Sequence, residues 1–330
     1  SVVSTTSPYV DRLKALLDTI DQGSVDAVVL ALKAARTVYI AGNGWNEGSY
    51  LGAFRMENNV VYSGDITLTA NARLGQYGSS TATINGNIAG DYQLEIWNGT
   101  GTSAMYLNPS VTNSFASLIL TGSQNSYALK PGATGPGAIT FGSGTPQLWL
   151  QYAETNTLIN PIGGTGNLIV NTTGGLTVDG TAGINIAGNT LYIGYNANAR
   201  LTVAAGGSIN AATIHLSDTA NYSTVTQTGG SITVGASNCY LGNTASGGGA
   251  WRQTGGTYTG GGEFTMAWNA ASYGYYENSG GSLTTAGWLQ LARGVGSIGM
   301  YYLKDGTMSS TANGLIVGNS GTGVFYVTGG

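Results

Sequence analysis

From Leu191 to its last residue the chain alternates apolar and polar positions in short runs, and one phrase recurs six times. Each unit contains an apolar pair, then a polar or Gly-rich turn, and later a doublet of small residues. The pairs are Leu191/Ile193, Ile214/Leu216, Cys239/Leu241, Phe264/Met266, Leu289/Leu291 and Leu315/Val317. They recur roughly every 23–26 residues, and a period of this length with matched columns indicates stacked structural repeats.

The alternating runs predict short strands, and the Gly, Asn and Ser residues between them predict turns. Strands this short do not form an independent sheet. If the chain winds once per unit, each strand pairs in parallel with its equivalent one coil away, at about 4.8 Å. The sequence therefore predicts an all-β fold, a right-handed parallel β-helix (β-solenoid) with about 23–26 residues per coil. The handedness follows from the general bias of parallel crossover connections.

Two further columns are predicted to stack in the interior of the coil. One precedes the second doublet residue by five positions, and its aromatic members are expected to pack ring on ring. Its members are Thr202, Val225, Trp251, Tyr276, Tyr301 and Phe325. The other column contains Gln227, Gln253 and Asn278, whose side-chain amides are expected to bond to one another along the axis.

Composition narrows the class of protein. Gly occupies 55 of 330 positions but Pro only six, which excludes collagen, and aromatic residues at 9% argue against disorder. A net charge of −4, with eleven Lys and Arg residues and no basic run, gives no footprint for nucleic acid. No apolar run is long enough to span a membrane. Only 8% of residues are charged, and a surface rich in Thr, Ser, Asn and Gly predicts an extracellular or bacterial cell-surface location.

The segment 1–44 follows a different pattern. Pro8 and Ser24 are suitable starts for two helices, and 37–40 predicts a strand. The first helix has an apolar stripe of Leu13, Leu16, Leu17 and Ile20. Such helices are expected to cap the open end of the first coil. We therefore divide the chain into a helical cap (1–44), a solenoid with irregular loops (45–190) and regular solenoid repeats (191–330).

Residues 8–44, PYVDRLKALLDTIDQGSVDAVVLALKAARTVYIAGNG, resemble the start of the sugar isomerase (SIS) family, especially phosphoheptose isomerases. In that family two helices lead into a strand and a G-N-G-G-S loop that binds the sugar phosphate. Gly42, Asn43 and Gly44 agree with the loop, but Trp45 and Asn46 depart from it and the rest of that domain is missing. The resemblance implies a fragment reused as a cap, with sugar-phosphate binding through 42–44 as a remote alternative.

Residues 51–101 resemble the autotransporter-associated β-strand repeat of secreted bacterial passenger proteins. The resemblance lies in the phrase LGAFRM, then YSGDITLT at 62–69, then INGNIAG at 84–90. It extends in looser form to about residue 190, and the regular repeats up to 330 share its general style. It implies a parallel β-helix displayed on or released from the cell surface, frequently adhesive. Five of the six prolines fall between 100 and 165 and predict turns. Residues 129–144 predict a loop leaving the coil, and Leu158 and Ile159 are expected to return to the core.

Catalytic groups are sparse. A glycan-active enzyme on this scaffold needs converging carboxylates, and only Asp65, Asp91 and Glu95 are candidates to converge. His215 lies between two inward residues, so it points outward and is expected to be solvated. Arg252 and Glu277 stack and are expected to form an exposed ion pair. We predict no enzyme activity, no cofactor and no metal site, with a polysaccharide lyase or hydrolase as the alternative.

The remaining candidates concern binding and assembly. Trp268, Tyr302 and Tyr326 are candidate contacts for glycans or partners, and the two tyrosines share an outward column with Arg252. No helix follows Val324, Phe325 and Val327, so this last strand is expected to pair with further repeats of the chain or with a second molecule, head to tail. The predicted function is an extracellular structural or adhesive β-solenoid, with self-assembly into filaments and contacts to surface glycans.

Overall fold

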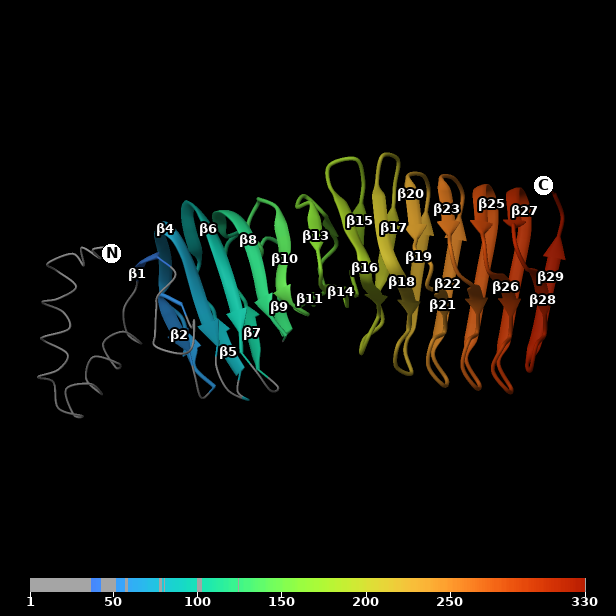
Figure 1. Cartoon of the computed structure of the whole chain (residues 1–330), viewed down its shortest axis with the longest axis horizontal. Coiled ribbons are helices and arrows are strands. Elements are labelled where there is room, and N and C mark those ends of the chain that lie inside the picture. Colours follow the sequence, from blue (N-terminus) through green and yellow to red (C-terminus); the bar gives the residue numbers. More distant parts are fainter. Residues whose placement is uncertain are drawn as a thin grey trace, which may run out of the picture.

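A computed structural model describes residues 37–42, 52–56, 59–76, 79, 81–99, 103–123 and 125–329, with 37–42 described by their backbone only. Within these residues 29 strands, all paired in parallel, form one β-solenoid of about 11 turns, drawn out as a rod (Figure 1). The predicted all-β parallel solenoid is therefore confirmed. The described part contains no helix, and none that could cross a membrane. The predicted helical cap, with Leu13, Leu16, Leu17 and Ile20, lies outside the described residues.

The register of the strands defines three walls, here named A, B and C. Wall A contains β3 (Val61–Tyr62), β5 (Thr81–Ile84), β7 (Ala104–Leu107), β9 (Asn125–Ala128), β11 (Gln147–Leu150), β14 (Asn167–Val170), β21 (Cys239–Leu241), β24 (Phe264–Met266), β26 (Trp288–Leu291) and β28 (Gly314–Val317). It also contains the second halves of β16 (Gly183–Ile193) and β18 (Ser208–Leu216).

Wall B follows wall A along the chain and is the wall that carries the candidate site. It contains β1 (Thr37–Gly42), β12 (Asn156–Thr157), β15 (Leu176–Val178), β17 (Arg200–Val203), β19 (Tyr222–Gln227), β22 (Gly248–Gln253) and β29 (Thr322–Val327). The first halves of β4 (Asp65–Gln76), β6 (Ile88–Asn98), β8 (Ser114–Gly122), β25 (Tyr273–Thr285) and β27 (Ile298–Ser310) complete it. The strand predicted at 37–40 is β1, which pairs with β4.

Wall C closes the coil. It contains β2 (Phe54–Met56), β10 (Ile139–Gly144), β13 (Ile162–Gly164), β20 (Ser231–Val234) and β23 (Thr257–Gly260), with the first halves of β16 and β18 and the second halves of β4, β6, β8, β25 and β27. The longest strands cross the corner between walls B and C, where β25 and β27 shift register after Asn278.

Equivalent inward side chains lie on top of one another through the rod. In wall A one column reads Ala82, Met105, Ser126, Leu148, Leu168, Leu191, Ile214, Cys239, Phe264, Leu289 and Leu315. From Leu191 onward the coils have the predicted length. Between Ala82 and Leu191 most steps along this column are shorter, so the predicted coil length holds only for the regular repeats.

The aromatic column of wall B is also confirmed. Trp251, Tyr276, Tyr301 and Phe325 are in register, with successive ring centroids 6.0, 5.1 and 5.4 Å apart. Leu201, and not Thr202, is the member of this column in the coil before Val225, and the column continues to Leu176. The prediction was one residue out because the turn from Val203 to the next strand is one residue longer than the equivalent turn one coil later. The rings fill the interior with edge and tilted contacts, which aromatic pairs prefer.

The amide ladder forms, but its hydrogen bonds differ from those predicted. Gln227, Gln253 and Asn278 are stacked in register and fully buried. Each side-chain amide donates to a backbone carbonyl of the next coil, at Thr257, Ser282 and Thr307 respectively. These carbonyls lie where the chain enters wall C after the B–C corner. The side chains therefore satisfy buried backbone groups instead of one another.

A column of glycines at the A–B corner was not recognised from the sequence. Gly249, Gly274, Gly299 and Gly323 are in register on wall B. A Cβ at Gly274 would lie 2.3 Å from the backbone nitrogen of Ala267, and the other three face equivalent backbone atoms. Ala267 itself has a left-handed φ of 63°, so each coil makes a sharp turn directly after its apolar pair. In these four coils only a residue without a side chain fits under the turn, whereas one coil earlier Ser223 occupies the equivalent position.

The proline-rich region departs from the prediction in two places. All of its prolines lie outside strands, as expected. Residues 129–144 do not leave the coil, because Ala133 and Thr134 are buried and 139–144 is strand β10. Ile159, predicted to return to the core with Leu158, is 47% exposed while Leu158 is buried. Alternation along the strand places only one of two neighbouring residues inside.

Candidate functional site

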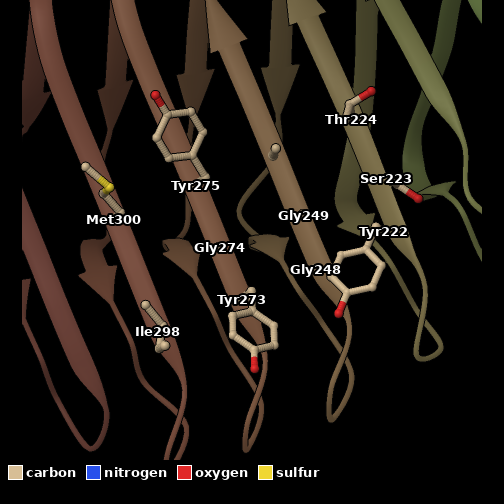
Figure 2. A pocket seen from close by; sticks show the side chains of 11 residues that line it. Tyr222, Ser223, Thr224, Gly248, Gly249, Tyr273, Gly274, Tyr275, Ile298 and Met300 are labelled. Atoms are coloured by element: carbon tan, nitrogen blue, oxygen red, sulfur yellow. The ribbon is translucent and has the colours of Figure 1, made fainter.

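The outer face of wall B carries an apolar hollow in a surface that is otherwise mostly polar. It has a volume of about 290 Å³, and we call it the tyrosine groove (Figure 2). It is lined by Tyr222, Ser223, Thr224, Gly248, Gly249, Ala250, Tyr273, Gly274, Tyr275, Ile298 and Met300. These residues come from β19, β22, β25 and β27. The groove therefore crosses four coils of the rod.

The groove exists because small residues interrupt two outward columns. One column reads Tyr222, Gly248, Tyr273 and Ile298 along the axis. At Gly248 a Cβ would lie 2.3 Å from Cδ1 of Tyr222, so the ring of Tyr222 lies directly over this glycine. Tyr222 is 60% exposed and Tyr273 is 45% exposed. Figure 2 shows the two rings on the same rim, with Tyr275 and Met300 farther along the strands.

A second hollow, with a mixed polar and apolar lining, adjoins the tyrosine groove, and we call it the arginine depression. Its volume is about 450 Å³, and it is lined by Arg200, Thr224, Val225, Thr226, Ala250, Arg252 and Tyr275. Thr224, Ala250 and Tyr275 line both hollows, so the two are continuous. Arg252 is stacked on Thr226 and has a side chain 68% exposed. Guanidinium groups, hydroxyls and aromatic faces are thus presented side by side on one wall.

Glu277 organises the charges at the end of the arginine depression. Its carboxylate accepts hydrogen bonds from Nζ of Lys304 at 2.8 Å and from the hydroxyl of Tyr275 at 2.7 Å. The bond from Lys304, and next that from Tyr275, lower the pKa of Glu277. The predicted ion pair with Arg252 is present, but its Nε lies 3.8 Å away. Lys304 was missed because it is the extra residue at the register shift in β27, between Leu303 and Asp305, and therefore lies outside the simple alternation.

Tyr275 is a neutral hydrogen-bond donor in this cluster. Partial burial raises its pKa to about 12, and the hydrogen bond to the Glu277 carboxylate adds to that increase. The phenol therefore keeps its proton far above neutral pH. Its ring lines both hollows while its hydroxyl is held by Glu277.

Of the predicted binding residues, the structure brings two together. Tyr302 and Tyr326 are in register on the outer face of wall B, with ring centroids 5.0 Å apart, and Nζ of Lys304 lies 4.7 Å from the Tyr302 ring. Tyr302 also stacks on Glu277, so this pair lies beside the arginine depression. Trp268 is elsewhere, in the turn after β24 at the end of wall A. It contacts Tyr240 at 4.2 Å and lies under the guanidinium of Arg293 at 3.8 Å.

His215 is not a solvated surface residue as predicted. It points outward from β18 but is covered by neighbouring rings, with Tyr192 at 5.1 Å and Tyr240 at 5.3 Å. Its Nδ1 lies 3.1 Å from the carboxylate of Asp218. These rings belong to a continuous series of contacts along wall A, formed by Tyr106, Tyr127, Trp149, Tyr195, Tyr192, His215, Tyr240 and Trp268. Stacking of successive coils covered the imidazole, which alternation alone could not predict.

Two of the three carboxylates considered for catalysis, Asp65 and Glu95, are engaged with separate partners. Glu95 forms an ion pair with Arg73 at 2.9 Å, and Asp65 accepts hydrogen bonds from Asn87. Within the described ranges, no group of three or more His, Cys, Asp or Glu side chains is arranged to hold a metal ion. Cys239 is buried as predicted, and burial raises the pKa of its thiol. Of the loop considered for sugar phosphate, only the backbone of Gly42 is described, so that alternative stays a prediction.

Comparison of the chain with protein-family models, curated proteins and solved structures finds no match. The resemblances to the autotransporter-associated repeat and to the SIS family therefore stay predictions. Besides Lys304, the site residues that sequence reasoning missed are Tyr222, Tyr273, Tyr275 and Arg200. Their signal was available, because they occupy outward positions between the buried members of the same strands.

Proposed function

We propose that this chain is an extracellular structural and adhesive β-solenoid that binds glycans on the outer face of wall B. The observation that carries the proposal is the pair of exposed rings of Tyr222 and Tyr273, which flank Gly248 two coils apart. Two coils correspond to about 10 Å along the axis. Sugar rings have apolar C–H faces that pack on aromatic rings, and their hydroxyls suit neighbouring Thr and Ser side chains.

The scaffold supports binding because it is fixed before the ligand arrives. Each tyrosine belongs to a strand that is hydrogen-bonded on both sides by the adjacent coils. A preorganised surface loses little conformational freedom on binding, so modest contacts give useful affinity. A polymeric ligand can engage several such contacts at once, which raises its overall affinity without any new interaction.

The structural part of the proposal rests on the continuous ladders and the dry interior. Tyr276 and Tyr301 are fully buried between coils, and the apolar columns of wall A are buried as far as Leu291. In the last described coil, Phe325 stacks on Tyr301, whereas Val324 and Val327 are 41% and 51% exposed. This edge is suited to pairing with further repeats or with a second copy of the chain. A surface with few charges and many hydroxyls and amides supports an extracellular setting.

The test is binding of the purified protein to a panel of immobilised oligosaccharides, followed by calorimetry on any ligand found. In the double variant Tyr222→Ala/Tyr273→Ala, affinity is expected to fall about tenfold or more, the loss of roughly two aromatic contacts. Tyr92→Ala is the matched control, because Tyr92 is 40% exposed but lies in β6, far along the rod. Absence of any glycan ligand, or equal losses in the double variant and the control, would overturn the proposal.

A further inference from the structure

We infer that the ligand of this face is an anionic polysaccharide, whose sugar rings lie on the tyrosine groove and whose acidic groups bind Arg200 and Arg252 in the arginine depression. The inference rests on the proposed function and specifies its ligand class. It is carried by the continuity of two hollows of different chemistry, one aromatic and one cationic.

The charged side chains that line the two hollows are both positive. Arg200 and Arg252 line the arginine depression, and among the described residues no Asp or Glu side chain lines either hollow. This local excess runs against the chain as a whole, which has a net charge of −4. A neutral or cationic glycan would gain nothing from the charge of the two guanidinium groups. An acidic glycan matches them, and charge complementarity of this kind sets specificity and association rate.

The guanidinium of Arg252 has capacity left for a ligand. Its neighbour Glu277 already accepts hydrogen bonds from Lys304 and Tyr275, whereas Nε of Arg252 lies 3.8 Å from it, beyond hydrogen-bond distance. The Arg252 side chain is also 68% exposed. Guanidinium presents a planar fork of donors that matches a carboxylate or sulfate in two parallel hydrogen bonds.

The spacing fits a polymer better than an isolated anion. Arg200 is in register with Thr224 and, two coils away, with Ala250, while Arg252 lies two residues farther along its strand. The two arginines are therefore separated by about 10 Å along the axis, as are Tyr222 and Tyr273. A single small anion cannot bridge that distance, but successive acidic sugars of an extended chain can. The arginine pair and the tyrosine pair are both spaced along the rod axis, so one polysaccharide chain can contact both pairs.

The experiment compares four ligands on the same protein by calorimetry. They are an oligogalacturonate, a sulfated oligosaccharide, a neutral cello-oligosaccharide of similar length, and poly-L-glutamate. The variants are Arg200→Gln/Arg252→Gln and the control Lys130→Gln, a solvent-exposed cation in a turn remote from wall B's tyrosines. Thermal unfolding of each variant verifies the fold, and the exposed arginines are expected to leave it unchanged.

The expected result is preferential binding of an acidic oligosaccharide, weakened by salt and reduced about tenfold or more in the arginine variant, with no change in the control. The carboxylated and sulfated ligands distinguish which acidic group is recognised. Equal binding of poly-L-glutamate would overturn the inference, because charge alone would then suffice. Binding of the neutral oligosaccharide that is lost in the tyrosine variant but unchanged in the arginine variant would overturn the inference and leave the proposed function standing. If no saccharide binds at all, both fail.

Discussion

The hydroxyl of Tyr276 donates a hydrogen bond to Oε1 of Gln253 in the preceding coil, and both side chains are fully buried. Removing the hydroxyl leaves that buried carbonyl oxygen without its donor. Tyr276→Phe is therefore expected to lower the free energy of unfolding by about 1–3 kcal/mol. Urea unfolding followed by circular dichroism measures the change.

The matched control for this hydrogen bond is Tyr258→Phe. The Tyr258 hydroxyl is equally buried but lies beside the Cys239 thiol and has no nitrogen or oxygen partner in the described coils. A thiol is a weak partner, so this variant is expected to be neutral or slightly stabilising, within about 1 kcal/mol. Equal losses in the two variants would show that ring packing, and not the hydrogen bond to Gln253, sets the cost.

Gly274 is expected to tolerate no side chain. A Cβ there would lie 2.3 Å from the backbone nitrogen of Ala267, and neither backbone segment can move without shifting its coil. Gly274→Ala is expected to cost about 3 kcal/mol or more, as strong overpacking does. Gly188 is the comparison, because nothing lies within 4 Å of a Cβ built there. Gly188→Ala is expected to change stability by about 0.5 kcal/mol or less, and similar melting temperatures for both variants would contradict the glycine column.

Stability is expected to fall in alkaline solution. Burial raises the pKa of Tyr258 and of Tyr276 well above 10.0, and raises that of Tyr301 to about 12. Above pH 10 the unfolded chain releases these protons while the folded chain retains them, so the free energy of unfolding decreases as pH rises. Urea midpoints measured from pH 8 to pH 11 are expected to be level at first and to decline above about pH 10. A flat profile to pH 11 would contradict the burial of these phenols.

The ion pair between Lys304 and Glu277 predicts a pH effect at the acid end. The hydrogen bond from Lys304 lowers the pKa of Glu277, so its stabilising contribution is present above the ordinary pKa of 4.5 and is lost as pH falls through the folded value. In Lys304→Met the pKa of Glu277, followed by carbon NMR of the carboxyl group, is expected to rise towards that ordinary value. Lys130→Met should leave it unchanged. An unchanged pKa of Glu277 in Lys304→Met would show that the hydrogen bond from Tyr275, and not that from Lys304, lowers the pKa.

The last described coil predicts self-association. In a protein expressed as residues 1–330, Val324 and Val327 are exposed on β29, which would be a template for pairing. The double variant Val324→Lys/Val327→Lys is expected to reduce association at high concentration, measured by analytical ultracentrifugation. Val111→Lys, at a residue 62% exposed in a distant turn, is the control. If the unsubstituted protein is monomeric at all concentrations, the prediction that β29 mediates self-association is wrong.

The interior columns were readable from the sequence because identical environments repeat in every coil. Leu241, Met266 and Leu291 stack as their spacing indicated, and so do Trp251, Tyr276 and Tyr301. The errors in these interior columns fall at corners. Thr202 was placed one residue out of its column by a longer turn, and the carbonyl partners of the amide ladder lie just past the B–C corner. The repeat period predicts the positions of strands well and those of turns poorly, because the coils differ in length mainly at their turns.

The sequence by itself determined the architecture, since a period near one coil, with apolar residues in matched columns, has a stacked parallel solenoid as its natural solution. Only the tertiary structure decided which outward residues become neighbours. Tyr222, Gly248 and Tyr273 are distant from one another along the chain, yet they share one rim because winding brings each coil within about 5 Å of the next. The same stacking covered His215 and brought Lys304 to Glu277. The hydrophobic pattern determines which side chains are buried in the coil, whereas the exact length of each turn determines which outward side chains become neighbours.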